Sequence, residues 1–459
     1  MKLSTPKTSL KNTLLLVIVL YAGISQAQTV SFPPPWDTHY TVDAVYKNYL
    51  SNNSGHYIFI LNKTAWAYFA CTNPEGYLKK AQEEGITTIR VALEGKPYYD
   101  VLGWDLWPWG GTRNNPDYSI INVEYWDEVE KRIHLAGEMG IGIVLTLYNE
   151  LVFDESMIES QKVFWQTIID RLAKYPNILT WEIHNEHLGN EKFQSAAAHF
   201  LKQNDPYKRP VCSSDGTTDN AAGVHFDWMD LAIVHTCTGS TPSTIGSVNE
   251  LDEKGGTHHL RDWYQAVARN TRSHNKPAFN NESGRERRHG NDDPVHRRKQ
   301  GWIFNASGCF WTLHSWDGCE GIDDREYKAP GSEFLLNMRR FFESIPFWTL
   351  VPDSTVVQNR NPHLLCSTMS DPQRKHTVSY ICTLLTGEKC LSGSLQLRLP
   401  NGHYCITFLS PITLETLDKT YMTSKSLGSV TNIKIPDFVD DLLLHITSVD
   451  EIGTPLADR

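Results

Sequence analysis

Short apolar runs alternate with amphipathic helical patterns along residues 56–344, and this alternation constrains the fold more than any other feature of the chain. Apolar runs bounded by turn residues are typical of buried parallel strands, and the helices between them serve as crossover connections. The predicted strands cover residues 56–61, 86–93, 141–148, 178–183, 209–212, 231–235, 276–282 and 308–313. Eight such units in succession predict an α/β fold of the (β/α)8 TIM-barrel class.

The character of the sequence changes after residue 351, where the long helical patterns stop. Turn signals such as Asn401-Gly402 separate short β-rich runs, which cover residues 377–385, 394–399, 403–409 and 442–446. We therefore expect a barrel domain over residues 28–351 and a small C-terminal β-sandwich over residues 352–459.

Residues 1–27 have the pattern of a secretory signal peptide. A lysine-containing region precedes an apolar core at residues 14–22, and Ser25-Gln-Ala27 is a small-x-small cleavage site. We expect cleavage after Ala27 and a secreted or periplasmic mature protein. The apolar core is too short for a membrane span, and no later segment of the sequence predicts one.

Charge and cysteine content narrow the classes of ligand. The net charge of −10 argues against nucleic acid as a partner, because binding phosphates requires a basic surface. The nine cysteines form no CxxC pair and no Cys/His cluster of the zinc type, so we assign no metal. Four of them lie near the C-terminus and either form disulfides or remain as buried thiols, namely Cys366, Cys382, Cys390 and Cys405.

Two predicted strands end in a carboxylate. The fourth strand ends at Asn185-Glu186, and the seventh ends at Glu282. In a barrel of parallel strands, the C-terminal strand ends lie on one face and form the active site. Two carboxylates on that face suit glycoside hydrolysis, in which one protonates the leaving oxygen and the other attacks the anomeric carbon or activates water.

The sequence Trp-Glu-Ile-His-Asn-Glu at residues 181–186 resembles the fourth-strand motif of clan A glycoside hydrolases, and Phe-Asn-Asn-Glu at residues 279–282 resembles their seventh-strand nucleophile. The resemblance implies that Glu186 is the acid/base and Glu282 the nucleophile of a retaining mechanism. Glu150 ends the third strand in a similar Tyr-Asn-Glu sequence, and we expect it to bind or line the substrate. The alternatives are a structural Glu186 and a Glu282 paired with the arginines that follow it.

A narrower resemblance lies at both ends of the barrel. Ile-Leu-Asn-Lys-Thr-Ala-Trp at residues 60–66 and the segment 341–353 resemble the apiosidase-like barrel hydrolases, which carry a β-domain after the barrel. The sequence departs from that family at Asn62-Lys63, where Gly-Asp is usual, and at Asn185-Glu186, where the fourth strand often ends in Gly-Asp.

Four further residues are expected to support the two carboxylates. Arg90 lies inside the second strand, where a buried charge needs a partner, and the resemblance implies that it holds Glu282; the alternative is an ion pair lower in the barrel. The resemblance also implies that Asn185 binds the sugar 2-hydroxyl and that Trp311 forms the floor of the reactive-sugar subsite, unless Trp311 is barrel core. His235 ends the sixth strand and is either a neighbour of the nucleophile or a core histidine.

Two loops that follow predicted strands contain further candidate substrate-binding residues. Trp104, Trp107 and Trp109 follow the second strand and are either sugar-stacking platforms or a loop packed on the barrel rim. The segment 283–299 is rich in arginine. There Arg287 or Arg288 could bind the carboxylate of a uronic acid, since the planar guanidinium matches that group.

The rest of that basic segment has a plainer interpretation. We expect Arg297, Arg298 and Lys299 to lie on the solvated face of the seventh helix.

The sequence therefore predicts a glycoside hydrolase that acts on an oligosaccharide or polysaccharide without a cofactor. Two alternatives stay open: a carbohydrate-binding barrel without catalysis, and an inverting hydrolase, which differs in the separation of its carboxylates.

Overall fold

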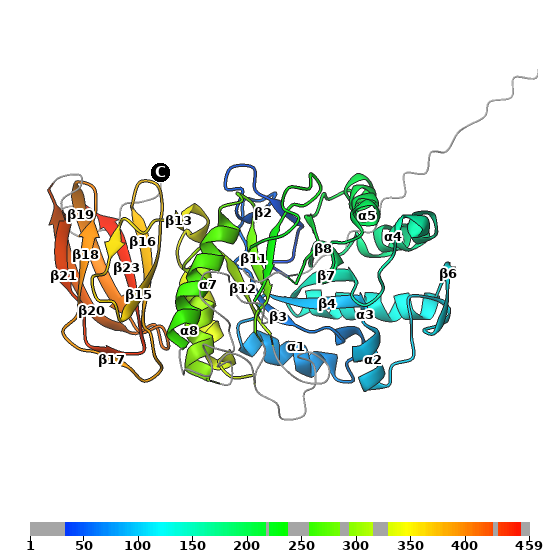
Figure 1. The fold of residues 1–459 in the computed structure, drawn as a ribbon, viewed down its shortest axis with the longest axis horizontal. Helices are drawn as coiled ribbons and strands as arrows, with labels where there is room; N and C mark the ends of the chain where they lie inside the picture. Colours follow the sequence, from blue (N-terminus) through cyan, green and yellow to red (C-terminus); the bar gives the residue numbers. More distant parts are fainter. Residues whose placement is uncertain are drawn as a thin grey trace, which may run out of the picture.

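The computed structural model describes residues 33–216, 220–236, 257–284, 293–314, 329–425 and 430–450, which form a barrel followed by a β-domain (Figure 1). Eight parallel strands lie in the order β10-β11-β12-β3-β4-β7-β8-β9. Their bounds are β3 (Leu61–Thr64), β4 (Thr88–Glu94), β7 (Gly142–Tyr148), β8 (Ile178–His184), β9 (Val211–Cys212), β10 (Ala232–His235), β11 (Ala278–Glu282) and β12 (Phe310–Leu313). The backbone N–H of Asp230, next to β10, donates to the carbonyl of Val211 in β9 (2.8 Å), so the barrel is nearly closed. The predicted (β/α)8 barrel is confirmed.

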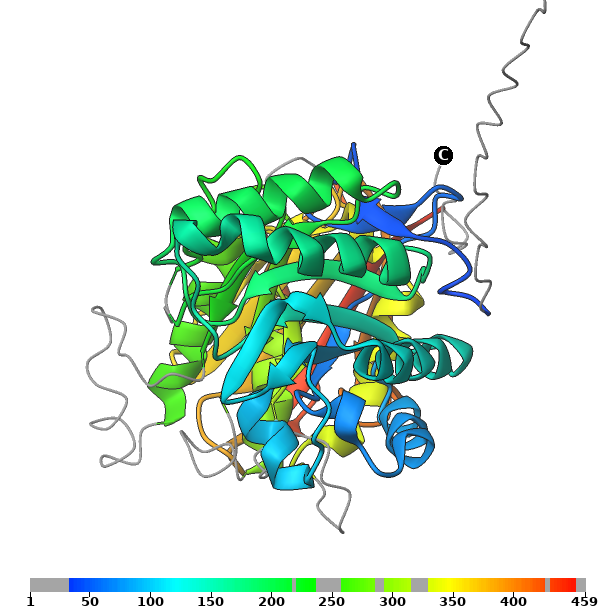
Figure 2. The ribbon, with the colours of Figure 1, turned by 90° about the vertical axis from the view of Figure 1, so that its right-hand side faces the viewer.

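Helices cover the outside of the barrel (Figure 2). They are α1 (Pro74–Glu83), α3 (Val123–Glu138), α4 (Ile158–Leu172), α5 (Glu191–Asn204), α7 (Thr257–Arg272), α8 (Pro294–Asn305) and α9 (Leu335–Glu343). Local sequence explains where they begin: the side chain of Asn122 accepts a hydrogen bond from the N–H of Tyr125 and caps α3. The same helix buries an apolar face that includes Trp126, Val129 and Ile133 against the strands.

The connection between β4 and α3 differs from the prediction. Instead of a plain loop it contains α2 (Lys96–Leu102) and a hairpin of β5 (Trp109–Thr112) and β6 (Asn115–Ile121). Glycines at positions 110 and 111 obscure the strand pattern in the sequence, because glycine has no side chain to show alternation.

An N-terminal segment packs against the start of strand β7. It carries the short pair β1 (Tyr40–Val42) and β2 (Leu50–Asn52), which is antiparallel. The buried ring of Trp36 lies against Gly142 at the start of β7, where an added Cβ would come within 2.0 Å of the ring. A glycine is therefore required at this position. The indole N–H of Trp36 donates to the carbonyl of Gly140 (3.1 Å).

The C-terminal domain consists of antiparallel sheets, as the β-rich sequence predicted. One sheet has the strand order β13-β15-β16-β23-β19-β20, a second has the order β14-β18-β21, and β17 pairs with β22. Apolar side chains between the sheets form a separate core that includes Ile381, Leu397 and Phe408. The strands are β13 (Val351–Pro352), β14 (Val357–Gln358), β15 (Leu364–Ser370), β16 (His376–Thr383), β17 (Lys389–Cys390), β18 (Ser394–Arg398), β19 (Gly402–Leu409), β20 (Thr416–Ser424), β21 (Val430–Lys434), β22 (Phe438–Val439) and β23 (Asp441–Val449).

Helix α8 lies between the barrel and the β-domain, so the prediction of a solvated basic face was wrong. Arg297, Arg298 and Lys299 are all buried. Arg298 donates to both carboxylate oxygens of Asp441 (2.8 and 2.9 Å), and Lys299 donates to Asp440 (3.0 Å). The helix needs these cations because the β-domain presents two aspartates to it.

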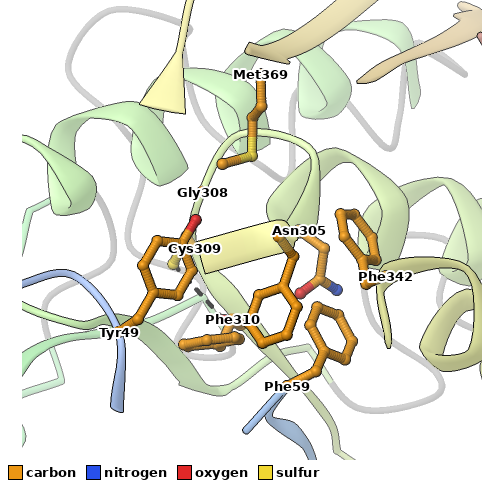
Figure 3. A pocket seen from close by; sticks show the side chains of 9 residues that line it. Tyr49, Phe59, Asn305, Gly308, Cys309, Phe310, Phe342 and Met369 are labelled. Atoms are coloured by element: carbon orange, nitrogen blue, oxygen red, sulfur yellow. Dashed lines mark hydrogen bonds between the residues drawn. The ribbon is translucent and has the colours of Figure 1, made fainter. Parts of the chain in front are cut away.

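Aromatic side chains of the barrel domain pack together next to Met369 of the β-domain (Figure 3). Phe59 stacks on Phe342 with ring centroids 4.7 Å apart, and Tyr49 meets Phe310 edge-on. The free space that they leave, about 10 Å³, is too small for a substrate. This region packs the two domains together and does not form a ligand site.

All four C-terminal cysteines are thiols and form no disulfide with one another, namely Cys366, Cys382, Cys390 and Cys405. Burial raises the pKa of Cys366 to about 12, which keeps it protonated. Across the described ranges, no helix has the length and apolarity that a membrane crossing requires. The predicted signal peptide, residues 1–27, lies outside the described residues.

Candidate active site

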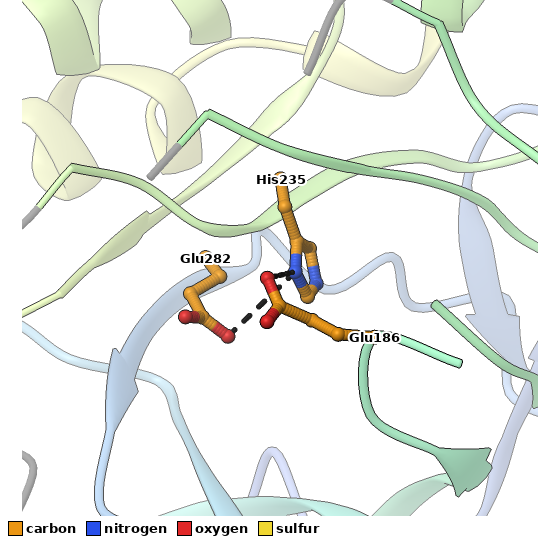
Figure 4. A group of neighbouring side chains, drawn as sticks. All are labelled: Glu186, His235 and Glu282. Atoms are coloured by element: carbon orange, nitrogen blue, oxygen red, sulfur yellow. Dashed lines mark hydrogen bonds and ion pairs between the residues drawn. The ribbon is translucent and has the colours of Figure 1, made fainter. Parts of the chain in front are cut away.

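Glu186 and Glu282 meet at the C-terminal end of the barrel. Glu186 lies two residues after the end of β8, and Glu282 is the last residue of β11. Figure 4 shows their carboxylates turned toward each other, with the imidazole of His235 beside them. The facing carboxylate oxygens and the ring nitrogen of His235 all lie within 4.8 Å of one another. Of the two acids, Glu186 is the more accessible, since its side chain is 34% exposed and that of Glu282 is 9% exposed.

Glu186 has an unusual backbone conformation. Its φ of 50° lies in the left-handed region, which non-glycine residues rarely adopt outside turns and functional sites. Its N–H donates to the hydroxyl of Ser214 (3.1 Å), which helps to hold this turn. Because the strand ends here, Asn185 and Glu186 both direct their side chains to the mouth of the barrel, where each hydrogen-bonds a site residue.

His235, at the end of β10, lies beside Glu282, which is one of the two placements predicted for it. Its Nδ1 atom is 2.9 Å from Glu186 Oε1 and 3.7 Å from Glu282 Oε2. Burial alone would lower the pKa of His235, but the charge of Glu282 and the hydrogen bond with Glu186 raise it above its usual value.

Arg90 makes the predicted contact with Glu282. Its Nη1 donates to Glu282 Oε2 (2.9 Å), and its Nη2 donates to Asn185 Oδ1 (2.8 Å). The guanidinium lies 4.3 Å from the ring centroid of Trp66, in the Thr-Ala-Trp motif, which is cation–π geometry. Burial opposes the charge of Arg90, yet the carboxylates of Glu182 and Glu282 raise its pKa above the usual value.

Glu182 is a site residue that the sequence analysis missed. It lies on β8 without exposure to solvent, and it accepts from Arg90 at both oxygens, from Nε to Oε2 (2.8 Å) and from Nη2 to Oε1 (2.6 Å). Burial opposes ionisation of Glu182, but the charge of Arg90 and its hydrogen bonds lower the pKa of the carboxyl. The sequence contained a signal for Glu182, because a glutamate inside an apolar strand is buried and needs a charged or hydrogen-bonding partner, as Arg90 does.

A second missed carboxylate organises the rim. Glu94 ends β4, is buried, and its Oε2 accepts from the backbone N–H groups of Asn149 (3.0 Å), Glu150 (2.6 Å) and Leu151 (3.0 Å). Asn149 in turn contacts the side chains of Glu150 (3.3 Å) and Asn185 (2.9 Å). Glu150 is thus an exposed carboxylate close to Asn185, where a substrate-binding role remains a prediction.

At the eighth strand, His314 and not the predicted Trp311 lies close to Glu282. Trp311 is fully buried, and an added Cβ on Gly301 of α8 would lie 3.3 Å from its ring, so Trp311 faces the helices and not the substrate. The prediction of a sugar floor at Trp311 was wrong because alternate residues of a strand point to opposite faces. His314, just beyond the strand, lies with Nδ1 2.7 Å from the carbonyl of Ser283 and 3.7 Å from Glu282 Oε1.

Trp107 is also buried, with 3% of its surface exposed, and its ring packs against Trp109 at 5.5 Å. The packed-rim interpretation therefore describes Trp107 and Trp109, whereas Trp104 is partly exposed. Arg287 and Arg288 lie outside the described residues, so their contact with a substrate carboxylate remains a prediction.

The cluster of Glu186, His235 and Glu282 is compact enough to raise the question of a metal ion. Arg90 already donates to Glu282, and the Nδ1 atom of His235 that faces the cluster is already hydrogen-bonded to Glu186. Arg90 offsets part of the charge of the two carboxylates. We therefore assign no metal to the site.

The chain resembles known proteins in sequence and in fold. The chain matches the apiosidase-like catalytic domain family over residues 45–309, and no curated protein matches it. Its fold is similar to that of a solved glycoside hydrolase (TM-score 0.66, 15% identity, covering 91% of this chain and 99% of that chain). It is also similar to a glycoside hydrolase family 5 protein from Bacteroides vulgatus (TM-score 0.67, 17% identity, covering 94% and 99%). The family match spans more than half of the 459 residues, and the chain therefore belongs to the apiosidase-like catalytic domain family and is a glycoside hydrolase.

Proposed function

We propose that this glycoside hydrolase acts with retention of configuration, with Glu282 as nucleophile and Glu186 as acid/base. The observation that carries the proposal is the proximity of the two carboxylates, whose facing oxygens lie within 4.8 Å. Retaining enzymes hold their carboxyl groups about 5–5.5 Å apart, whereas inverting enzymes leave about 6.5–9.5 Å for a water molecule.

The two acids have environments that suit different roles. Arg90 donates directly to the nearly buried Glu282, and an adjacent cation favours a charged carboxylate. Glu186 is more exposed and can exchange protons with solvent. In the first step, Glu282 attacks the anomeric carbon and the glycosidic C–O bond breaks, while Glu186 transfers its proton to the leaving oxygen. In the second step, Glu186 takes a proton from a water molecule. The oxygen of that water attacks the anomeric carbon, and the bond between this carbon and Glu282 breaks.

The proposed substrate is an oligosaccharide or polysaccharide with a uronic acid at or near the cleavage point. The support comes from the sequence directly after Glu282, where Arg285, Arg287 and Arg288 precede the next helix in a chain that is acidic overall. Arginine binds carboxylates in a bidentate manner and so fixes the orientation of a sugar. The proposed location is secreted or periplasmic, on the signal-peptide pattern of residues 1–27.

Product stereochemistry tests the mechanism. Proton NMR of a running reaction identifies the first anomer released, before mutarotation mixes the two. Retention is expected. Inversion would favour the inverting alternative, and no turnover on a broad panel of plant and host glycans would favour a carbohydrate-binding barrel.

A further inference from the structure

The guanidinium of Arg90 is shared between two carboxylates in the floor of the active site. Nε and Nη2 donate to Glu182, and Nη1 donates to Glu282. The guanidinium is planar and rigid, so a bidentate bond to one carboxylate fixes the direction of the remaining donor. The orientation of Glu182 thus determines where the third donor of Arg90 points.

Glu182 is itself held in place. The hydroxyl of Thr146 donates to its Oε2 (2.7 Å), and the side-chain amide of Asn281, next to the nucleophile on β11, donates to its Oε1 (3.2 Å). All of these side chains are buried, so solvent cannot substitute for the contacts. Three strands, β7, β8 and β11, therefore cooperate to fix one carboxylate that cannot touch a sugar.

We propose that Glu182 is a positioning residue for the reaction, which aims Arg90 at Glu282 and takes up part of its positive charge. This inference rests on the proposed role of Glu282 as nucleophile. A guanidinium held by Glu282 alone would stabilise the carboxylate so strongly that its attack on the anomeric carbon would slow. With Glu182 on the opposite side, Arg90 divides its charge between the two carboxylates, and Glu282 keeps its nucleophilicity.

Three other titratable groups of the described residues face Glu282 from neighbouring elements. They are Glu186 after β8, His235 on β10 and His314 after β12, at distances of up to 4.8 Å, 3.7 Å and 3.7 Å. A substitution at position 182 leaves all of them in place. The substitution removes the charge of Glu182, which acts on Arg90 and also on His235.

The test compares Glu182→Gln with Thr146→Val. The first removes the negative charge and keeps the shape, and the second removes one hydrogen bond to the same carboxylate and keeps every charge. The readout is the dependence of kcat/KM on pH for one substrate, with kcat and KM separated. Activity on the acid side is lost when Glu282 becomes protonated. We expect the acid limb of Glu182→Gln to move to lower pH by about one unit, because Arg90 then acts on Glu282 alone.

We further expect kcat of Glu182→Gln to fall at least tenfold with little change in KM, while the acid limb of Thr146→Val stays in place. An acid limb that does not move in Glu182→Gln, or that moves to higher pH, would overturn the shared-charge inference. If Glu182→Gln does not fold, Glu182→Asp tests the positioning role instead, because it keeps the charge and shortens the side chain. An unchanged kcat in that variant would overturn the positioning role.

Failure of the inference is distinct from failure of the proposed function. If Glu282→Gln keeps its activity, the assignment of the nucleophile is wrong, whatever position 182 does. If Glu282→Gln is inactive and the acid limb of Glu182→Gln does not move, only the role of Glu182 is rejected.

Discussion

Arg90 Nη1 and Glu282 Oε2 are 2.9 Å apart, although their strands, β4 and β11, are not neighbours in the barrel. The contact crosses the interior between them, so the active site depends on closure of the whole barrel. Its two residues are separated by 192 positions in the chain. A local change at either strand end is therefore expected to alter the position of the proposed nucleophile.

Replacement of the nucleophile should abolish turnover. We expect Glu282→Gln to reduce kcat by more than about 10³-fold, because the amide cannot form the glycosyl-enzyme ester. Initial rates on any glycan that the wild type cleaves measure the effect. Glu155→Gln serves as the control, since Glu155 is a 59% exposed carboxylate in the connection after β7. Comparable losses in both variants would argue against a specific role for Glu282.

Removal of the acid should have an effect that depends on the leaving group. Glu186→Ala is expected to slow the first step on natural glycosides by about 10²–10⁴-fold, because the leaving oxygen is no longer protonated. Aryl glycosides with acidic phenols need no proton and should react nearly normally in that step. Pre-steady-state release of the phenol separates the two cases, and equal losses on both substrate types would contradict the acid role.

Arg90 should determine how stability responds to pH. The lowered pKa of Glu182 means that its contribution to stability is present above its unfolded pKa, about 4.3, and is lost as the pH falls through the folded value. Arg90→Met leaves Glu182 buried without a cation and should cost about 3–5 kcal/mol at neutral pH.

In that variant Glu182 loses the charge of Arg90 and keeps only the hydrogen bonds of Thr146 and Asn281 and the charge of His235. Its folded pKa should therefore rise, so less stability should be lost as the pH falls. Urea unfolding of both proteins from neutral pH to about pH 4 measures the two slopes. Parallel slopes would mean that Arg90 and Glu182 are not coupled.

The ion pair between α8 and the β-domain should stabilise the docked arrangement. Arg298→Met leaves Asp441 buried without its partner, and we expect a loss of about 3–5 kcal/mol in the free energy of unfolding. Lys162→Ala is the control, because its pair with Glu159 is exposed and should contribute less than about 1 kcal/mol. The double variant Arg298→Met/Asp441→Asn should recover part of the loss; purely additive effects would show that the two residues do not interact.

A uronic acid in the substrate should be detectable through the arginines after β11. Arg287→Ala or Arg288→Ala is expected to weaken the charged glycan by roughly 1.5–3 kcal/mol and to leave its carboxyl-reduced form nearly unchanged. The ratio of kcat/KM between the two substrates is the measurement. If both substrates respond alike, recognition of a carboxylate by this segment is rejected.

Much of this architecture could be predicted because the strands of a closed barrel are buried on both faces and appear as apolar runs. The placement of Glu186 and Glu282 followed from the rule that strand ends share a face. Trp311 shows where that reasoning stops: a shift of one residue along a strand reverses its face, and strand bounds from sequence are not that accurate.

Local sequence patterns also could not predict ion pairs between residues that are distant in the sequence. Arg298 and Lys299 follow a polar helical pattern, and only the docked β-domain, which supplies Asp440 and Asp441, explains why they are buried. Glu182 could have been found, because a charged side chain within an apolar strand is informative in itself.

The central claim is that Glu282 becomes covalently attached to the sugar. In Glu186→Ala, an activated aryl glycoside should react in the first step, and the slow second step should let the glycosyl-enzyme accumulate. Mass spectrometry of the quenched protein measures this directly. We predict an added mass of one glycosyl unit on the peptide that contains Glu282, and none when Glu282→Gln is introduced as well. A glycosyl group on another residue, or aryl release without any covalent adduct, would contradict the proposed mechanism.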